Sequence, residues 1–305
     1  MDINKFRDIA REQFPLTETM AYLDTSTTGL LSKNATQAMV DHLTDRFEDA
    51  MDVTKLKENW KLADCLRPQV AELLGASQDE IIFSDSCSSM LNIFSSGISL
   101  NDNANVVVSG LTFPSTAYTW MNRVGEENLR FATPVDGQVP LDSLFSLVDE
   151  DTAVISLCLV ENTTGFRHDL KTISAFCQEK GIHLVVDATQ AAGAMHIDVE
   201  ATPVDFLTTS CFKWLGCPFG LAFAYCSKRI MDKIHPTYVG WTGNKRRMDH
   251  SKYNLNLSDG ASRFETGSLN WLALKGLKEA IELYLTLGKE DVEANSPLQK
   301  QIKSQ

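Results

Sequence analysis

Several features that mark common classes of protein are missing from this sequence. No apolar run approaches the ~20 residues that a membrane-spanning helix needs. The N-terminus, MDINKFRDIAREQF, has no apolar signal-peptide region. There is no CxxC spacing, so a zinc site is not expected. A nucleotide-binding dehydrogenase is a poor interpretation too, because neither GxGxxG after a strand nor a P-loop motif occurs.

Positive charge is also scarce. The chain has 28 Lys and Arg residues against 40 Asp and Glu residues, which gives a net charge of −12. Lys245, Arg246 and Arg247 form the single basic cluster, which is typical of a solvated loop. Without a basic stripe, neither a nucleic acid nor a membrane surface is expected as a partner. Seven cysteines without paired spacing predict reduced thiols and a cytoplasmic location.

Apolar runs alternate with helical patterns along most of the chain. Strands are expected at 80–83, 105–108, 154–160, 182–186, 204–207 and 221–225, and helices at 34–48, 57–74, 90–96, 170–180 and 271–287, with another beginning at Pro114. The alternation predicts an α/β fold, with a mostly parallel sheet and helices on both faces. Three segments are expected: an N-terminal helical segment (1–20), a large domain (21–250), and a connection leading into a truncated small domain (251–305).

Two neighbouring apolar runs lead to residues with acid–base chemistry. The run 182–186 ends on Asp187, and the run 204–207 leads to Lys213, which lies 26 positions after Asp187. Ligands bind beyond the carboxyl ends of the strands in an open α/β sheet, so both side chains are expected to point into one crevice. A carboxylate and an amine at one crevice are the layout that a pyridoxal phosphate site requires.

Each of these two residues has an ordinary structural interpretation as well. An aspartate after a strand is common as a helix N-cap, and a lysine in a turn is usually a surface residue. The apolar neighbours of Lys213 favour the cofactor interpretation, because burial lowers the pKa of an amine and makes it nucleophilic. The negative charge of Asp187 suits a partner of the protonated pyridine nitrogen.

A serine-rich turn, Ser84–Ser89, supplies candidates for the phosphate. It lies between an expected strand and an expected helix, where free backbone N–H groups and the helix dipole attract an anion. Ser88 and Ser89 are the candidates on this turn, and Ser210 adds a hydroxyl from across the crevice. Serine-rich turns are common without a ligand, so this evidence is only supporting. Gln190 can donate a hydrogen bond to the ring oxygen of the cofactor.

Three ordered motifs resemble those of one enzyme family. DATQ (187–190), SCFKWLG (210–216) and FETGSLN (264–270) are similar to motifs of the class V aminotransferase family of fold-type I pyridoxal phosphate enzymes. That family includes cysteine desulfurases, kynureninases and isopenicillin-N-epimerase-like proteins. The resemblance covers the chain from about Tyr22 to Leu287. It implies pyridoxal 5'-phosphate as the cofactor, an amino acid as the substrate, and the fold of the fold-type I large domain.

The resemblance implies roles for individual residues. Lys213 would form the Schiff base and move the Cα proton, Asp187 would pair with the pyridine nitrogen, and Gln190 would contact the ring oxygen. Ser88, Ser89 and Ser210 would hold the phosphate.

Three further roles follow from the same resemblance. Phe113 would stack on the ring, although a plain core aromatic is an equally good interpretation of that residue. Asn162 would lie near the ring oxygen. Ser268 would reach the phosphate of the partner subunit, which implies a homodimer with shared active sites.

The chain also departs from the family pattern. Phe212 stands where desulfurases commonly have a histidine, and no cysteine occupies the position of the desulfurase nucleophile. The arginine that usually binds the substrate carboxylate has no clear equivalent. Transamination, C–S lysis and epimerisation therefore all stay open. The alternative is a truncated, non-catalytic relative that binds the cofactor or a partner.

Overall fold

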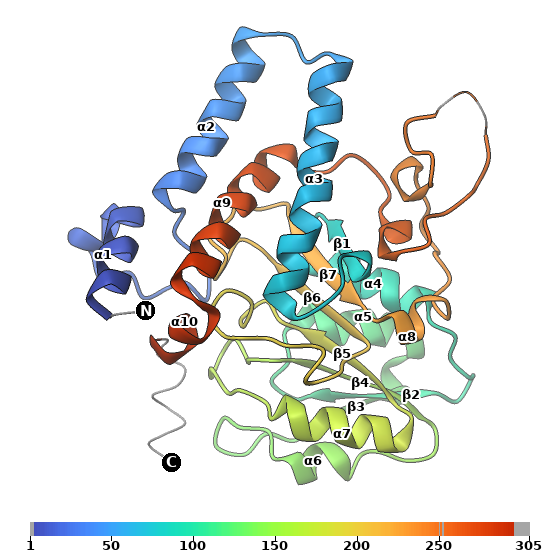
Figure 1. Cartoon of the computed structure of the whole chain (residues 1–305). Coiled ribbons are helices and arrows are strands. Elements are labelled where there is room, and N and C mark those ends of the chain that lie inside the picture. Colours follow the sequence, from blue (N-terminus) through green and yellow to red (C-terminus); the bar gives the residue numbers. More distant parts are fainter. Residues whose placement is uncertain (1–2, 250, 252, 296–305) are drawn as a thin grey trace.

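A seven-stranded sheet forms the centre of the computed structural model, which describes residues 3–249, 251 and 253–295 (Figure 1). The strand order is β1-β7-β6-β5-β4-β2-β3. The strands are β1 (Ile81–Ser84), β2 (Asn105–Ser109), β3 (Leu129–Ala132), β4 (Thr152–Cys158), β5 (His183–Asp187), β6 (Phe206–Ser210) and β7 (Ala222–Cys226). The longer helices are α1 (Ile3–Gln13), α2 (Lys33–Glu48), α3 (Val53–Leu74), α4 (Cys87–Gly97), α5 (Pro114–Val124), α7 (Leu170–Lys180) and α9 (Trp271–Leu287). The short ones are α6 (Leu141–Phe145), α8 (Lys228–Met231) and α10 (Lys289–Asn295).

Six of the seven strands run in the same direction, which confirms the mostly parallel sheet. The pairs β6–β5, β5–β4, β4–β2 and β2–β3 are parallel, whereas β7 is antiparallel to both β6 and β1. Strand β7 is reversed because the turn that joins it to β6 contains no crossover helix. The carboxyl ends of β4, β5 and β6 therefore meet at one edge of the sheet.

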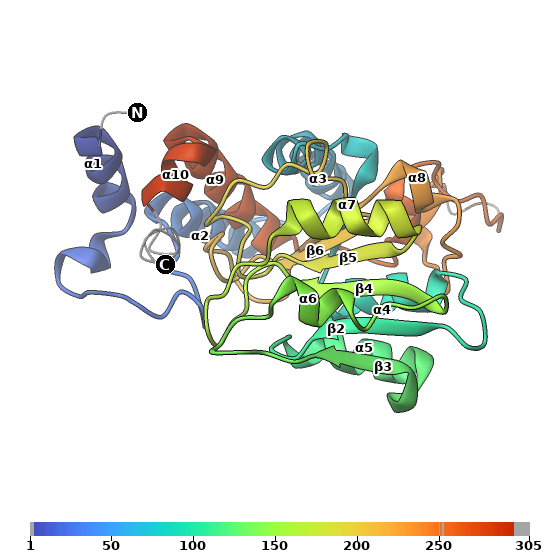
Figure 2. The same cartoon turned by 90° about the horizontal axis from the view of Figure 1, so that it is seen from below.

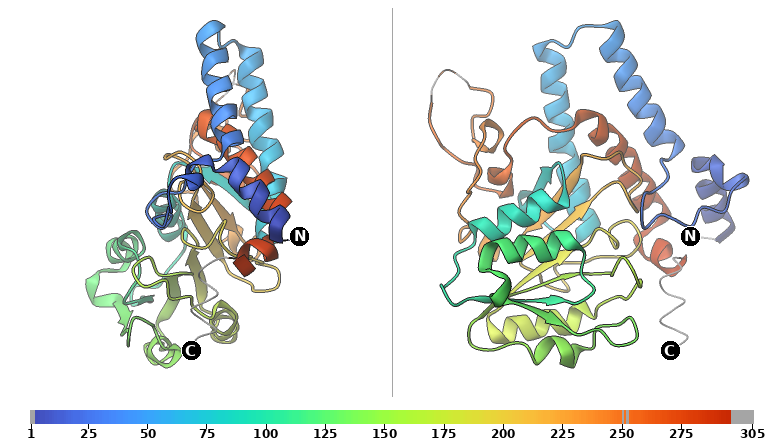
Figure 3. Two further views of the ribbon diagram at one scale, coloured as in Figure 1. Left: turned by 90° about the vertical axis from the view of Figure 1, so that its left-hand side faces the viewer. Right: turned by 180° about the vertical axis from the view of Figure 1, so that it is seen from behind.

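Helices cover both faces of the sheet, as the alternating pattern predicted (Figures 2 and 3). Successive strand residues point to opposite faces. Ile155, Val186 and Leu207 belong to a core shared with α3, α7 and α9. Their strand neighbours Val154, Val185 and Phe206 belong to a second core shared with α4 and α5. Two cores on one sheet fix the register of every strand, because a one-residue slip would exchange the faces.

The boundaries of several elements differ from the sequence-based prediction. Strand β4 begins and ends two residues earlier than the predicted 154–160, since the Thr152 hydroxyl bonds to Asn105 at the start of β2 and extends the pairing there. Helix α3 begins at Val53 rather than at residue 57, because Asp52 caps it by accepting from the N–H groups of Thr54 and Lys55. Strand β3 and helix α6 were not predicted, because both are too short to show a period.

The polar tail contains a helix as well. Residues from Lys289 onward were expected to be frayed, yet α10 continues to Asn295. Residues 296–305, the rest of the expected tail, lie outside the described part. Helix α9 packs against α2 and α3 on the same face of the sheet, so residues 271–287 are part of the main body (Figure 1). No helix in the part of the chain that the structure describes has the length and apolarity that crossing a membrane requires.

The segment before α2 lies against the carboxyl edge of the sheet. The backbone N–H of Gly29 donates to the carbonyl of Phe212 at 2.9 Å. A Cβ atom at Gly29 would lie 1.8 Å from the carbonyl oxygen of Lys213, so no side chain fits there. The turn around residues 24–29 is thus in direct backbone contact with the segment that carries Lys213.

Candidate active site

One cavity of about 220 Å³ lies beyond the carboxyl ends of β4, β5 and β6. Its wall contains most of the residues that the sequence singled out, namely Ser88, Phe113, Asn162, Asp187, Gln190, Ser210 and Lys213. These residues come from five separate segments of the chain and meet because parallel strands end at a common edge. The crevice expected between Asp187 and Lys213 is therefore present.

Lys213 extends into this cavity from the turn after β6. Its ammonium nitrogen lies 5.7 Å from the ring centroid of Phe113 and 5.8 Å from that of Phe212. Burial lowers the pKa of Lys213 below its ordinary value, and the charge of Asp187 partly opposes the change. An amine with a lowered pKa is neutral in a larger fraction of molecules at neutral pH, so it is a better nucleophile and base.

Asp187 is the last residue of β5 and is only 5% exposed. One carboxylate oxygen accepts a hydrogen bond from the backbone N–H of Thr189 at 2.8 Å. Burial raises the pKa of Asp187, while hydrogen bonds from Thr189 and Cys87 and the charge of Lys213 oppose the rise. A buried carboxylate of this kind is stabilised by a cation placed beside it, such as a protonated ring nitrogen.

The N-terminus of α4 forms another wall. Ser86 caps the helix by accepting from the N–H of Ser89 at 3.1 Å, and its hydroxyl also bonds to the Ser89 hydroxyl. Ser88 instead bonds to the hydroxyl of Ser115, at the start of α5. Across the gap, the hydroxyl of Ser210 accepts from the backbone N–H of Cys87 at 3.4 Å. Hydroxyls and helix N–H groups at this end of the cavity are suitable ligands for a phosphate.

Two predicted residues lie away from the cavity wall. Ser89 is engaged in the cap of α4 and does not line the cavity. Ser268 is exposed and lines a separate depression with Gly220 and Asn270. Since the role predicted for Ser268 is in the partner subunit, its distance from the cavity of its own chain leaves that prediction open.

The sequence did not single out every residue of the wall. Cys87, Ser115, Cys158 and Thr189 line the cavity as well. Cys158 ends β4 and lies under Phe113, whose backbone N–H donates to its sulfur at 3.4 Å. Burial raises the pKa values of the Cys87 and Cys158 thiols well above normal, so neither is reactive as a thiolate at neutral pH. The position of Cys158 at the end of a predicted strand beside β5 was the available clue.

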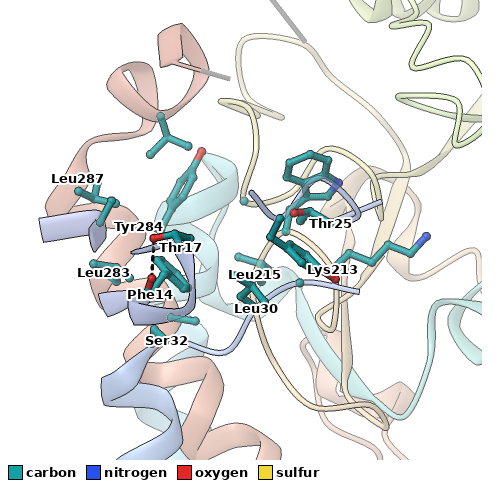
Figure 4. A pocket seen from close by; sticks show the side chains of 18 of the residues that line it. Phe14, Thr17, Thr25, Leu30, Ser32, Lys213, Leu215, Leu283, Tyr284 and Leu287 are labelled. Carbon is teal, nitrogen blue, oxygen red and sulfur yellow. Dashed lines mark hydrogen bonds between the residues drawn. The ribbon is translucent and has the colours of Figure 1, made fainter. Parts of the chain in front are cut away.

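A second, more apolar cavity of about 320 Å³ lies behind the backbone of Lys213. Helix α1 contributes Phe6 to its wall, and helix α9 contributes Leu283 and Leu287. The side chain of Lys213 leads away from Leu283 and Leu287 (Figure 4). Lys213 therefore separates the two cavities: its backbone borders the apolar one, and its amine belongs to the polar one.

The residues of the polar cavity fit pyridoxal phosphate. The chemistry of the donor set matches each part of the cofactor, with an amine for the aldehyde, a buried carboxylate for the ring nitrogen, and hydroxyls at a helix N-terminus for the phosphate. Phe113, which is 40% exposed, offers its ring beside the amine. Asp187 ends β5 and Lys213 follows the neighbouring strand β6, and both residues line this cavity.

Comparison with known proteins identifies the family. Residues 21–304 match the family model of class V aminotransferases. The uncharacterized aminotransferase YcbU of Bacillus subtilis (strain 168) is 27% identical over 279 residues, which cover 91% of this chain and 73% of that protein. A probable cysteine desulfurase of Methanothermobacter thermautotrophicus is 28% identical over 284 residues, which cover 91% of this chain and 70% of that protein.

Solved structures agree in fold. The complex of the cystine C–S lyase C-DES with cysteine persulfide superposes with a TM-score of 0.83 at 20% identity, covering 91% of this chain and 75% of that one. The apo cysteine desulfurase of Thermococcus onnurineus NA1 gives 0.78 at 23% identity, covering 92% and 71%. The fold is that of fold-type I pyridoxal phosphate enzymes. The chain belongs to the class V aminotransferase family. It is an enzyme of that type, and its cofactor is pyridoxal 5'-phosphate.

Proposed function

We propose that the protein acts on an amino acid through a covalent bond between Lys213 and the cofactor. The observation that carries the proposal is the shared cavity of Lys213 and Asp187, where burial shifts both pKa values toward the neutral forms. Lys213, as a neutral amine, would be the group that bonds to the cofactor aldehyde, and Asp187 would hold the cationic ring nitrogen. Bound pyridoxal phosphate supplies an electron sink for the electrons of the substrate Cα bond.

The other residues of the cavity hold and orient the reactants. Ser88 and Ser210 bind the phosphate at the α4 N-terminus, where the helix dipole adds attraction. Phe113, whose ring centroid lies 5.7 Å from the Lys213 amine, would pack against the cofactor ring and limit its movement. Gln190 and Asn162 reach the ring oxygen, and the Asn162 amide lines the cavity. Lys213 would also accept or return the Cα proton, because it lines the cavity and its lowered pKa suits a general base.

Sulfur-containing amino acids are the first substrates to test. Relatives are named as cysteine desulfurases, and a structural neighbour is named as a cystine C–S lyase. C–S lysis is therefore the reaction we place first, ahead of transamination and epimerisation. Cysteine, cystine and a panel of other amino acids should be compared, with sulfide, keto acid and chirality of the amino acid as separate readouts.

Reduction with borohydride tests the role of Lys213. Wild-type protein incubated with pyridoxal phosphate and then reduced should carry the cofactor mass on the peptide that contains Lys213. The Lys213→Ala variant should carry none, whereas Lys57→Ala, which removes an exposed lysine of α3, should label like the wild type. Labelling of another lysine in the wild type, or no labelling at all, would refute the proposal.

A homodimer with shared sites is part of the same proposal. Ser268 is exposed beside Gly220, and the aromatic side chains of Phe219 and Tyr118 are also exposed, at 63% and 66%. Such a surface suits an interface in which Ser268 completes the phosphate site of a partner subunit. Light scattering should give the mass of a dimer, and Ser268→Ala should weaken cofactor binding without changing that mass. A monomer that binds the cofactor normally would contradict this part.

We also propose that the enzyme works in the cytoplasm. We propose 1–20 as an N-terminal helical segment, 21–250 as the large cofactor-binding domain, and 251–305 as a connection and the start of a small domain, whose helix α9 packs back on the large domain. The seven cysteines are all free, as expected in a reducing compartment. Cell fractionation with an antibody against the protein checks the location. Limited proteolysis checks the segment boundaries.

A further inference from the structure

The side-chain amide of Gln190 is held at both of its ends. The indole N–H of Trp214 donates to Gln190 Oε1 at 2.8 Å. Gln190 Nε2 donates to the backbone carbonyl of Ser26 at 2.9 Å. Gln190 follows β5, Trp214 follows Lys213 directly, and Ser26 belongs to the turn before α2, so three distant segments meet at this amide.

Both bonds fix the same orientation of the amide. The two ends of a glutamine amide have nearly the same shape, so bonding alone distinguishes them. An indole N–H only donates, and a carbonyl oxygen only accepts. If the amide turned over, two donors would meet at Trp214 and two acceptors would meet at Ser26. One N–H of Nε2 donates to Ser26, so a second N–H remains. Because Gln190 lines the cofactor cavity, this second N–H is available to a ligand there.

We propose that Trp214 is a positioning residue for the cofactor, acting by holding Gln190 so that its remaining N–H donates to the ring oxygen. This inference rests on the function proposed above. Trp214 itself borders the apolar cavity and does not line the cofactor cavity, so its influence on the cofactor passes through Gln190. Family likeness predicts the contact from Gln190, whereas the role of Trp214 comes from the geometry of this chain.

The same arrangement couples the N-terminal turn to the site. The carbonyl of Ser26 lies in a turn in which the N–H groups of Thr27 and Thr28 donate to the carbonyl of Asp24. Gly29 ties that turn to Phe212, the residue before Lys213. Thr25, in the same turn, and Lys213 line the same apolar cavity (Figure 4). A shift of the turn therefore reaches the amide of Gln190 directly.

A double-mutant cycle on cofactor affinity tests the proposal. Apoprotein is titrated with pyridoxal phosphate by equilibrium dialysis for the wild type, Trp214→Phe, Gln190→Ala and the double variant. A hydrogen bond to a charged oxygen is worth ~1.5–3 kcal/mol, or about 10- to 100-fold in affinity, and Gln190→Ala should lose an amount in this range. Trp214→Phe should lose about twofold, because a freed amide that samples both orientations presents its N–H to the ring oxygen in roughly half of the molecules. Its effect should disappear in the Gln190→Ala background.

Absorbance of the bound cofactor provides a second readout that simple packing would not move. A donor at the ring oxygen stabilises its ionised form, so losing that donor should move the pH midpoint of the visible spectrum upward. Trp214→Phe and Gln190→Ala should move the midpoint in the same direction. Trp271→Phe is the matched control, because Trp271 packs edge-on against Trp60 and should leave affinity and midpoint unchanged.

Several outcomes would overturn the inference. Unchanged affinity and midpoint in Trp214→Phe would do so, and so would an equal loss in both backgrounds of the cycle. If Trp214→Phe does not fold, NMR of nitrogen-labelled apoprotein tests the bond between Trp214 and Gln190 directly. Gln190→Ala should strongly change the chemical shift of the Trp214 indole N–H. No shift would refute the bond. A wild type that fails to attach the cofactor at Lys213 refutes the proposed function as well, whereas normal attachment with a silent Trp214→Phe refutes this inference alone.

Discussion

Arg67 and Glu265 are 198 positions apart in the sequence and form a buried ion pair. One guanidinium nitrogen donates to both carboxylate oxygens at 2.7 and 2.8 Å, and the other donates to the carbonyl of Ile81. Glu265 also accepts from the backbone N–H of Phe83 at 2.9 Å. The pair thus joins α3 and the FETGSLN motif to strand β1, whose carboxyl end leads into the serine-rich turn.

Breaking this pair should destabilise the fold strongly. Arg67→Met leaves the carboxylate of Glu265 buried without its cation, which should cost about 3–5 kcal/mol in the free energy of unfolding. Lys55→Met is the matched control, because Lys55 pairs with Asp45 and Asp49 in contact with solvent, where the loss of an ion pair changes stability little. Urea unfolding of the two variants measures both values. Equal losses would contradict the assignment of a structural role to the pair.

The carboxylate of Asp187 should lower the free energy of unfolding of the apoprotein and raise its affinity for the cofactor. Its folded pKa is raised above 3.8, so the folded state binds more protons than the unfolded state once the pH exceeds that value. Stability therefore falls as the pH rises from 3.8 through the folded pKa, and the full cost is present above the folded pKa. Asp187→Asn should give an apoprotein at least as stable as the wild type at pH ~7, with cofactor affinity at least about tenfold lower.

Thermal unfolding at several pH values checks the first part of that prediction, and equilibrium dialysis checks the second. The difference in stability between Asp187→Asn and the wild type should vanish in acid, where the carboxyl group is protonated in both states. An apoprotein that loses stability on this change at neutral pH would show that the carboxylate has a compensating partner.

Gly29 should tolerate no side chain. The added Cβ of Gly29→Ala meets the carbonyl oxygen and carbon of Lys213 at 1.8 and 2.8 Å, so the N-terminal turn or the Lys213 segment must move. Overpacking of this kind should cost about 1–3 kcal/mol and should lower cofactor affinity. Gly267→Ala is the control, because a Cβ there has no neighbour within 4 Å. Similar stability and affinity for the two variants would disprove the close contact.

The thiols should differ widely in reactivity. Cys65 is exposed, whereas the other six cysteines are buried, and burial raises the pKa of Cys177 to about 12. Titration of the native protein with a thiol reagent should give one fast equivalent, and Cys65→Ser should remove it. The remaining thiols should react only after unfolding. Peptide mapping should identify which cysteines react. Fast modification of Cys87 or Cys158 would show that the cofactor cavity opens to solvent.

The sequence predicted most of what lies at strand ends. The cavity that joins Asp187 and Lys213 followed from two apolar runs and their order, because strand ends in a parallel sheet share an edge. The place of Phe113 beside them was predicted from the family resemblance alone. The reversal of β7 did not follow, since direction depends on the connection and not on the apolarity of the run. Strand β3 and helix α6 show no period, because they have only four and five residues.

Contacts across long sequence distances were also beyond prediction. Gln190 was expected to face the cofactor, but its bonds to Ser26 and Trp214 bridge 164 and 24 positions. Cys158 and Ser115 line the cavity because their elements are adjacent in space, and neither belongs to a motif. Sequence patterns thus predicted the reactive groups. The residues that hold those groups in place depend on contacts between distant segments, which only the folded structure shows.

The reversed strand β7 has a consequence for how the protein is made. Strand β1 forms its sheet pairing with β7 alone, and Ile81 pairs with Tyr225, which lies 225 − 81 = 144 residues further along. At ribosomal speeds of ~5–20 residues per second, β1 emerges roughly 7–30 s before its partner exists. Until β7 is synthesised, the apolar strand β1, which leads into the serine-rich turn, has no strand to pair with. We expect chaperones to bind the growing chain mainly during this interval.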